Sequence, residues 1–399
     1  MQTPGLFIGN VSWALAREGE TFNVTASTPH TLTRLLSPAP FGARTLRNRL
    51  VMAPMTRSQS PGHAPNERNV EYYRRHAAGG VGLIITEGTT VGHAAASGYP
   101  DVPAFDGEAA LQGWKAVADA VHAEGTAIIP QLWHVGSVRQ PGMQPDGSVP
   151  GHGPSAVVHP SVAASNGVAP HVMTETDIGD VVNAFARSAR HAQALGFDGV
   201  ELHGAHGYLI DQFFWALTNQ RTDRHGGGLA ERTRFAAQIV RAVRENVSRD
   251  FPVSIRLSQF KLGDFQYRVA HDPSELETWL GPLVDAGIDV FHCSQRRFDE
   301  PEFDGSPLNF AGWVKKITGK PTVTVGSVGL NADFISSFGG QAAGSVGVER
   351  LLDRLNREEF DFVAVGRALL ADPDWPNKLA TGAYGDVVSF APEHLQRYV

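Results

Sequence analysis

The sequence predicts an α/β fold: an eight-stranded parallel (β/α)8 barrel, also called a TIM barrel, with long loops on its catalytic face and an N-terminal extension. Eight short runs rich in Val, Ile and Leu recur between residues 50 and 365. They lack polar alternation, as is typical of parallel strands buried on both faces. Helical periodicity lies between most of them, and eight strand–helix units are the number that closes a barrel.

The predicted strands, in chain order, are Leu50–Ala53, Val81–Thr86, Thr126–Leu132, Gly199–Leu202, Val253–Leu257, Val290–Cys293, Thr322–Val325 and Phe362–Val365. The predicted helices are Asn66–Ala78, Ala109–Ala123, Ile178–Leu195, Leu229–Val247, Ser274–Ala286, Phe310–Ile317 and Ala332–Phe338, with a further one near Pro373–Leu379. Apolar residues at spacings of three and four define the inner face of each helix.

Three segments fall outside this alternation. Residues 1–33 have no clear period and contain several Pro and Gly residues, so we expect a partly disordered N-terminal extension before one barrel domain over residues 34–399. The stretch Val135–Met173 is dense in Pro, Gly, Ser and His and follows the third strand, which predicts a large loop on the catalytic face. A second insertion, Gly339–Glu359, contains the charged helical run Val348–Asn356.

Composition excludes several classes of protein. A net charge of −7 and a pI near 6.1 give no reason to expect nucleic acid as a partner. The single cysteine, Cys293, excludes a disulfide framework, a zinc ribbon and a four-cysteine iron–sulfur site within this chain. No apolar run approaches the roughly 20 residues of a membrane span. We therefore expect a cytoplasmic protein with a small-molecule substrate; the number of subunits stays open.

The most informative stretch is Gly199–Phe213, a buried strand that runs into a polar loop. Two imidazoles, His203 and His206, lie three residues apart there, and the phenol of Tyr208 follows. Catalytic side chains in barrel enzymes lie just beyond the carboxyl ends of the strands. Two N–H donors and one weak acid at this place can bind an oxygen atom and protonate a neighbouring carbon.

The ends of the other predicted strands carry side chains that suit a flat heterocycle. Thr56, which follows Pro54 and Met55, can donate a hydrogen bond to a ring carbonyl, and the amide of Gln131 can both donate and accept. The positive charge of Arg256 favours an anionic reduced ring. Gly88 follows the second strand and Trp133 the third.

The last two strand ends predict a phosphate site. Gly326 and Ser327 follow the seventh strand, and Gly366 and Arg367 follow the eighth. Backbone N–H groups and a guanidinium at this place form the usual phosphate site of barrels. Together with the ring-binding set, this pattern indicates bound flavin mononucleotide (FMN). No G-x-G-x-x-G follows the first strand, so a Rossmann domain is not indicated.

The chain resembles the old yellow enzyme family of FMN-dependent ene-reductases. The resemblance runs in family order from about residue 35 to 380. The matching segments include residues 48–57 (Asn-Arg-Leu-Val-Met-Ala-Pro-Met-Thr-Arg), 84–88 (Ile-Ile-Thr-Glu-Gly), 98–100 (Gly-Tyr-Pro), 130–134 (Pro-Gln-Leu-Trp-His), 203–208 (His-Gly-Ala-His-Gly-Tyr), 219–223 (Asn-Gln-Arg-Thr-Asp), 256–258 (Arg-Leu-Ser) and 365–373 (Val-Gly-Arg-Ala-Leu-Leu-Ala-Asp-Pro).

This resemblance implies a role for each matching position. The cofactor-binding residues are Pro54, Met55, Thr56, Gly88, Gln131 and Arg256 for the flavin ring, and Gly326, Ser327, Gly366 and Arg367 for the phosphate. His203 and His206 would bind the carbonyl or nitro oxygen of the substrate, Tyr208 would be the proton donor, and Trp133 would line the substrate side. The hydride donor would be NADPH or NADH. Thr56, where a related subgroup has cysteine, favours the classical branch.

The sequence departs from the family in a few places. His225 stands where the family usually has tyrosine before Gly-Gly, and His292–Arg297 replaces a more usual sixth-strand ending. The segment Ala383–Val399 matches weakly, so the residues that complete that side of the site stay open.

Alternative functions also stay open. The same site could reduce nitrate esters or nitro groups, or the barrel could only carry or sense a ligand. His203 and His206 could instead hold a metal in a flavin-independent lyase or hydrolase, with His134 or His292 as a third ligand. The sequence favours the flavin interpretation and no catalytic metal. We interpret Cys293 as a small buried apolar residue.

Overall fold

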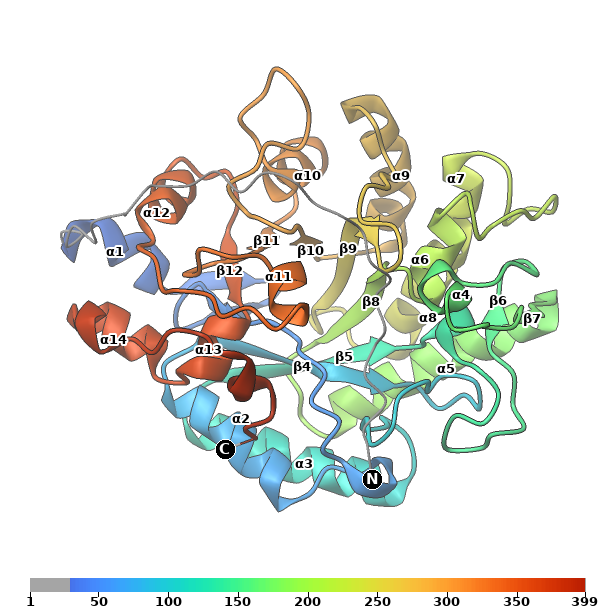
Figure 1. The fold of residues 1–399 in the computed structure, drawn as a ribbon, viewed down its shortest axis with the longest axis horizontal. Coiled ribbons are helices and arrows are strands. Elements are labelled where there is room, and N and C mark those ends of the chain that lie inside the picture. The colour runs from blue at the N-terminus through green and yellow to red at the C-terminus, as the bar shows by residue number, and fades with distance from the viewer. Residues whose placement is uncertain (1–28, 399) are drawn as a thin grey trace.

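Eight parallel strands close into a barrel in the computed structural model, which describes residues 29–398 (Figure 1). Neighbours around the barrel are also neighbours along the chain, and the last strand pairs with the first. The predicted fold class and all eight predicted strands are confirmed. The strands are β3 (Leu50–Met52), β4 (Leu83–Thr90), β5 (Ala127–Trp133), β8 (Val200–His206), β9 (Val253–Lys261), β10 (Val290–Ser294), β11 (Thr322–Val325) and β12 (Phe362–Val365).

Helices surround the barrel on its outside (Figure 1). They include α2 (Glu67–Ala78), α3 (Glu108–Ala123), α5 (Glu175–Ala194), α7 (Leu229–Arg232), α8 (Arg234–Asn246), α9 (Pro273–Ala286), α10 (Phe310–Thr318), α11 (Phe334–Phe338), α12 (Glu349–Asn356), α13 (Arg367–Ala371) and α14 (Trp375–Thr381). The prediction of one helix over Leu229–Val247 was wrong, because the chain is interrupted at Thr233. The hydroxyl of Thr233 donates to the Leu229 carbonyl at 2.8 Å, and its backbone N–H is shared between the carbonyls of Leu229 at 3.1 Å and Ala230 at 3.2 Å.

Helix α5 begins earlier than its apolar pattern predicted. Thr174 forms a capping box with Asp177: the hydroxyl of Thr174 accepts from the Asp177 N–H at 3.2 Å, and the Asp177 carboxylate accepts from the Thr174 N–H at 2.7 Å. The cap satisfies two N–H groups that would otherwise lack partners. The helix therefore starts at Glu175, whose side chain is exposed.

The amino-terminal part of the described chain closes one end of the barrel. Strands β1 (Ala39–Phe41) and β2 (Arg44–Leu46) form a hairpin that the sequence analysis did not predict. Phe41 and Leu46 pack into the cluster that fills the barrel interior, and the Phe41 ring meets that of Phe362 edge to face at 5.5 Å. Because these contacts lie at the amino ends of the strands, the opposite, carboxyl end is left for the site.

The predicted N-terminal extension covers residues 1–33. Residues 1–28 of it lie outside the described residues. Residues 29–33 belong to α1 (Pro29–Leu36), which packs beside α12 at the edge of the barrel (Figure 1). Helix α12 is the predicted helical run in the insertion 339–359. The connection between β11 and β12 thus contains two helices, α11 and α12.

The predicted large loop after the third strand is also found. Residues 135–173 contain only short elements: η2 (Gly136–Val138), β6 (His152–Gly153), α4 (Pro160–Ala163) and β7 (His171–Val172). His159 from this loop is buried, and its Nε2 lies 2.8 Å from the carbonyl oxygen of Gly207. The loop therefore touches the segment that follows β8.

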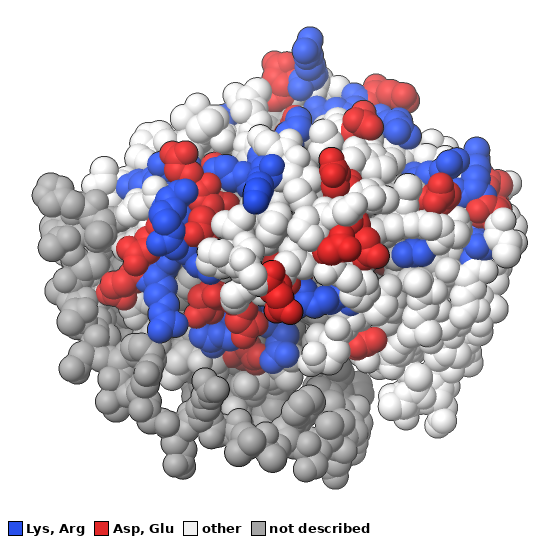
Figure 2. Space-filling model, turned by 90° about the horizontal axis from the view of Figure 1, so that it is seen from above, with Lys and Arg blue, Asp and Glu red and all other residues white. Residues whose placement is uncertain are grey.

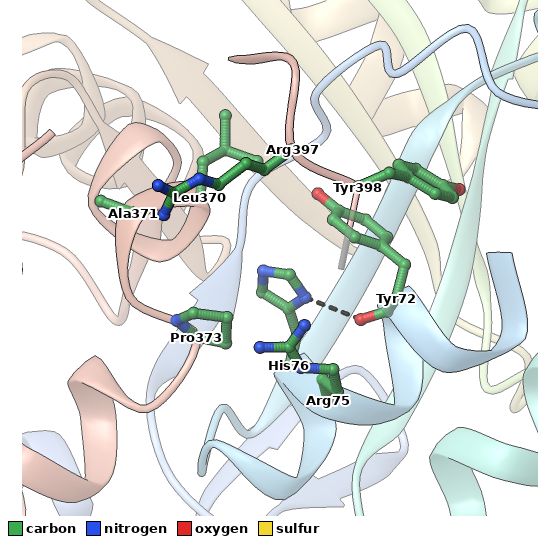
Figure 3. Close-up of a pocket in the computed structure, with 8 residues that line it drawn as sticks. All are labelled: Tyr72, Arg75, His76, Leu370, Ala371, Pro373, Arg397 and Tyr398. Carbon is green, nitrogen blue, oxygen red and sulfur yellow. Dashed lines mark hydrogen bonds between the residues drawn. The ribbon is translucent and has the colours of Figure 1, made fainter. Parts of the chain in front are cut away.

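The carboxyl-terminal segment packs against α2. Figure 3 shows a pocket lined by Tyr72, Arg75 and His76 of α2, with Tyr398 beside Tyr72 and with Leu370, Ala371 and Pro373 across the pocket. The rings of Tyr72 and Tyr398 stack with centroids 4.7 Å apart. In the neighbouring loop, Arg57 donates to the carbonyl of Leu395 at 3.1 Å. The last described residues therefore hold the loop that follows β3.

The surface carries charges of both signs. Figure 2 shows Lys and Arg side chains interspersed with Asp and Glu on one face, without one large patch of a single sign. In the described part of the chain, no helix is both long and apolar enough to cross a membrane.

Candidate active site

The predicted site residues lie in barrel strands or just beyond their carboxyl ends, and Arg256 lies in the middle of its strand. Residues 54–56 follow β3, Gly88 lies in β4, Gln131 and Trp133 lie in β5, and His203 and His206 lie in β8 with Tyr208 just beyond. Arg256 lies in β9, residues 326 and 327 follow β11, and residues 366 and 367 follow β12. Since the strands are parallel and the barrel is closed, these positions form one ring around its mouth.

The two histidines and the tyrosine lie against each other. The ring centroid of His203 is 5.3 Å from that of His206 and 5.0 Å from that of Tyr208. Burial, with the nearby charge of Arg256, lowers the pKa of both histidines well below the ordinary value. Both imidazoles are therefore neutral at physiological pH, and each carries one N–H group; Nε2 of His206 lies 2.9 Å from the Ser294 hydroxyl. The Nδ1 of His203 is buried without a hydrogen-bond partner.

The hydroxyl of Tyr208 faces a second tyrosine that the sequence analysis did not assign to the site. Its oxygen lies 3.2 Å from the hydroxyl oxygen of Tyr99. The Trp133 ring packs against both phenols. It stacks on the Tyr99 ring with centroids 5.4 Å apart and meets the Tyr208 ring edge to face with centroids 4.9 Å apart. Burial and the neighbouring Tyr99 raise the pKa of Tyr208 well above its usual value, so Tyr208 stays protonated.

A buried ion pair fixes the turn between His206 and Tyr208. Asp211, in the short helix α6 (Leu209–Phe214), accepts from the Gly207 N–H at 2.7 Å and from the Lys261 ammonium at 2.5 Å. Both side chains of this pair are completely buried. His206 itself has a left-handed backbone with φ of 65°, and its N–H donates to the Ser258 hydroxyl at 2.9 Å. The turn is thus held from several sides in a conformation that is uncommon for a residue other than glycine.

A network in the barrel interior orients Gln131. Its Nε2 donates to the Glu201 carboxylate at 2.8 Å, and the second oxygen of Glu201 lies 2.9 Å from Nδ1 of His292. Burial opposes a charge on Glu201, yet the pKa of Glu201 is held below its usual value because His292, Arg256 and Gln131 favour the carboxylate. The sequence analysis did not predict this network. The signal for it was Glu201, a charged residue within the predicted buried strand Gly199–Leu202.

Arg256 supplies a buried positive charge at the mouth. Strand pairing places it beside His203, and its Nη2 lies 3.4 Å from the hydroxyl of Ser294. Its Nε is buried without a partner. Burial lowers the pKa of Arg256 to about 10, which still leaves the guanidinium charged at neutral pH. A buried charge with an unpaired donor is costly unless an acceptor binds there.

The phosphate candidates lie on the loops after β11 and β12. Gly326 has φ of 150°, and a Cβ there would lie 2.7 Å from the Gln295 carbonyl, so only glycine fits. Ser327 is left-handed, with φ of 54°. The guanidinium of Arg367 donates to the carbonyls of Ala332 at 2.7 Å and Asp333 at 2.9 Å.

Arg367 therefore joins α11 to the last strand end. Its Nη2 also lies 3.4 Å from the Ser327 hydroxyl, which keeps it close to the loop after β11. No side chain caps the N-terminus of α13, which begins at Arg367. The uncapped start of α13, a left-handed serine and the positive charge of Arg367 suit a phosphate, and both Nη atoms of Arg367 already donate to protein oxygens, which fixes the guanidinium in place.

Glu87 and Gly88 shape the side of the mouth near β4. A Cβ on Gly88 would lie 2.6 Å from the Trp133 ring, so glycine is required there. Glu87 is buried and accepts from the N–H groups of Arg57 at 2.8 Å and Ser58 at 3.3 Å. These bonds fix the turn that carries Thr56, whose side chain is exposed.

A metal site at the two histidines gains no support. Among the described side chains, neither His203 nor His206 belongs to a group of three or more His, Cys, Asp or Glu residues close enough to share a metal ion. Cys293 is free and completely buried, and burial raises the pKa of its thiol well above the usual value. This agrees with its interpretation as a small apolar residue.

The fold and the site together define a barrel oxidoreductase whose donor set fits a flavin ring and its phosphate. Residues 34–386 match the NADH:flavin oxidoreductase / NADH oxidase family, and the chain belongs to this family, the old yellow enzymes. It is therefore an FMN-dependent oxidoreductase that uses a nicotinamide hydride donor.

Individual relatives agree with this assignment. A putative 12-oxophytodienoate reductase 4 of Oryza sativa subsp. japonica is 34% identical over 349 residues, which are 88% of this chain and 86% of the relative. A flavin oxidoreductase of Emericella nidulans is 34% identical and covers 87% of this chain and 90% of its own. The solved structure of morphinone reductase in complex with tetrahydroNAD superposes with a TM-score of 0.71 at 30% identity, over 92% of this chain and 97% of that one.

Proposed function

We propose that this protein is an ene-reductase that saturates the activated C=C bond of α,β-unsaturated carbonyl or nitro compounds with electrons from NADPH or NADH. The observation that carries the proposal is the cluster of His203, His206 and Tyr208 beside the buried charge of Arg256. Two neutral N–H donors and one protonated phenol meet there within contact distance of each other. The reaction needs these groups: donors for an oxygen that gains negative charge, and an acid for the adjacent carbon.

The hydrogen-bonding side chains around the barrel mouth suit FMN. Gln131 is oriented by Glu201, the turn of Thr56 is held by Glu87, and Arg256 has an unpaired buried N–H. Arg256 would stand at the edge of the ring where negative charge develops. When bound, the reduced flavin supplies the hydride that the β-carbon of the substrate receives.

His203 and His206 would hold the substrate oxygen. As the β-carbon gains hydride, negative charge moves onto that oxygen, and the two imidazole N–H groups stabilise it more than they stabilise the neutral carbonyl. One such donor is typically worth about 3 kcal/mol. Because the pKa of each histidine is well below its ordinary value, hydrogen bonding by a neutral imidazole, and not its protonation, supplies this stabilisation.

Tyr208 would give its phenolic proton to the α-carbon. The tyrosine is buried, and the Tyr99 hydroxyl at 3.2 Å can return a proton after each turnover. Trp133 packs against both phenols and covers one side of each ring. The nicotinamide donor and the alkene would use the same space in turn.

The proposal is tested by following the two half-reactions separately. FMN-loaded protein is mixed anaerobically with NADPH or NADH, and flavin absorbance is recorded; we expect rapid bleaching. Addition of an enone or a nitroalkene should restore the absorbance with one alkene saturated per flavin. Loss of one donor, in His203→Ala or His206→Ala, should slow the recovery by about 10²–10³. Bleaching without recovery by any activated alkene would contradict the proposal.

A further inference from the structure

His225 is a buried histidine outside the active site, in the loop that precedes α7. Its side chain is completely buried. The Nε2 atom lies 3.0 Å from Oε1 of Gln238, an amide oxygen that can only accept. Nε2 must therefore carry the ring hydrogen in the neutral imidazole, which leaves a lone pair on Nδ1.

That lone pair faces two carboxylates. Nδ1 of His225 lies 3.3 Å from Oε1 of Glu175 and 3.9 Å from Oδ1 of Asp223, and it is buried without a hydrogen bond. One ligand atom from each of the three residues lies within 4.8 Å of the other two. A lone pair directed at negatively charged oxygens is unfavourable unless a cation lies between them.

We propose that Glu175, Asp223 and His225 bind a divalent transition-metal ion of the zinc type. One imidazole nitrogen and two carboxylate oxygens are ligands that zinc accepts. Histidines that bind metals usually donate their other ring N–H to an oxygen, and His225 does so to Gln238. The two carboxylates are about half exposed, so an ion can enter from solvent and keep water ligands.

Two arginines contact the same carboxylates. Arg224 lies 2.5 Å from Oε2 of Glu175, which leaves Oε1 toward His225. Arg221 contacts both oxygens of Asp223. The hydrogen bond from Arg221 lowers the pKa of Asp223 to about 2, so this carboxylate is ionised at neutral pH. The arginines orient the ligands, but their positive charge also limits the affinity for a second cation.

The ion would connect three parts of the fold. Glu175 is the first residue of α5, Gln238 lies in α8, and Asp223 and His225 lie in the loop between α6 and α7. Asn219 ties this loop to α6, because its Nδ2 donates to the carbonyls of Phe213 and His225 at 2.8 Å each. Metal binding would therefore stiffen the loop that follows the active-site helix.

The test uses full-length, FMN-loaded protein that has been treated with a chelator and then titrated with ZnCl2. Bound zinc is measured by elemental analysis after gel filtration, and the melting temperature is measured with and without zinc. We expect about one zinc per chain and a higher melting temperature. His225→Tyr, which restores the residue usual in the family, and the surface change Glu175→Gln should each weaken binding at least tenfold.

The matched control is His122→Gln. His122 also pairs with a carboxylate, Asp198, at 2.8 Å on the surface, but among the described residues it is not part of a group of three side chains that could share a metal ion. This variant should keep the zinc and the thermal shift. The proposal is overturned if His225→Tyr and wild type retain equal zinc, or if wild type retains none.

Discussion

The hydroxyl oxygens of Tyr99 and Tyr208 lie 3.2 Å apart, and the indole of Trp133 packs against both rings. Tyr208 is buried, whereas Tyr99 is half-buried and nearer to solvent. Burial raises the pKa of both phenols. Under the proposed function, a tyrosinate left on Tyr208 after proton donation would be unfavourable, and the contact with Tyr99 would provide a route for a new proton.

Tyr208→Phe should slow alkene reduction by about 10²–10⁴, because the proton donor is lost. Flavin reduction by the nicotinamide should change little, since that step takes no proton from Tyr208. Stopped-flow measurement of each half-reaction checks this. Tyr99→Phe keeps the Tyr208 hydroxyl but removes the Tyr99 hydroxyl beside it. We therefore expect a smaller loss, about fivefold, in steady-state turnover, with flavin reduction unchanged. Equal losses in both half-reactions of Tyr208→Phe would show that Tyr208 is not the acid.

Gly88→Ala should destabilise the protein by about 1–3 kcal/mol, because the new methyl group would meet the Trp133 ring at 2.6 Å. Gly179→Ala is the matched control. Gly179 lies inside α5 with nothing within 4 Å of a built Cβ, so alanine should stabilise by about 0.5–1 kcal/mol. Urea unfolding of both variants gives the free energies. Shifts of the same sign would mean that Trp133 moves aside without cost.

Glu87→Gln should change the pH dependence of stability. Burial raises the pKa of Glu87 to about 7, above an ordinary value of 4.5. Between these values the folded protein binds the extra proton, so the contribution of Glu87 to stability falls as pH rises from about 4.5 to 7. Glutamine does not titrate. The variant should therefore gain about 2–3 kcal/mol relative to wild type between pH 5 and pH 8.

Urea unfolding at these two pH values checks the effect of Glu87→Gln. The absolute stability of the variant is lower if the new amide N–H₂ stays unpaired, so the comparison depends only on the difference between the pH values. If the free energies of unfolding of variant and wild type differ by the same amount at both pH values, Glu87 has the same pKa in the folded and the unfolded chain.

Lys261→Met should destabilise the protein by about 3–5 kcal/mol, because Asp211 would keep a buried charge without its partner. The turn at Gly207 depends on that carboxylate, so alkene reduction should fall as well. The double variant Lys261→Met/Asp211→Asn should recover part of the stability. Lys115→Met, which breaks an exposed pair with Asp119, should cost less than about 1 kcal/mol. Thermal unfolding compares the three variants.

The sequence predicted the strands and the ring of residues at their ends, because apolar runs, helix periodicity and turn residues are local features. Two of its failures were also local. The helix is divided at the single residue Thr233, whose backbone N–H is shared between two carbonyls, and the hairpin of Ala39–Leu46 is too short to show a period. Arg367 was predicted as a phosphate ligand, and its bonds to Ala332 and Asp333 could not be predicted because they join separate segments.

The order of residues along this chain determined that a barrel forms and which side chains reach its mouth, since each strand carries its own end residues with it. Only the tertiary structure decided which of these side chains meet. Tyr99 beside Tyr208, Glu201 between Gln131 and His292, and His225 against Glu175 are pairs from distant segments. Their contacts depend on barrel closure and on side-chain direction, and neither quantity is encoded in any single stretch of sequence.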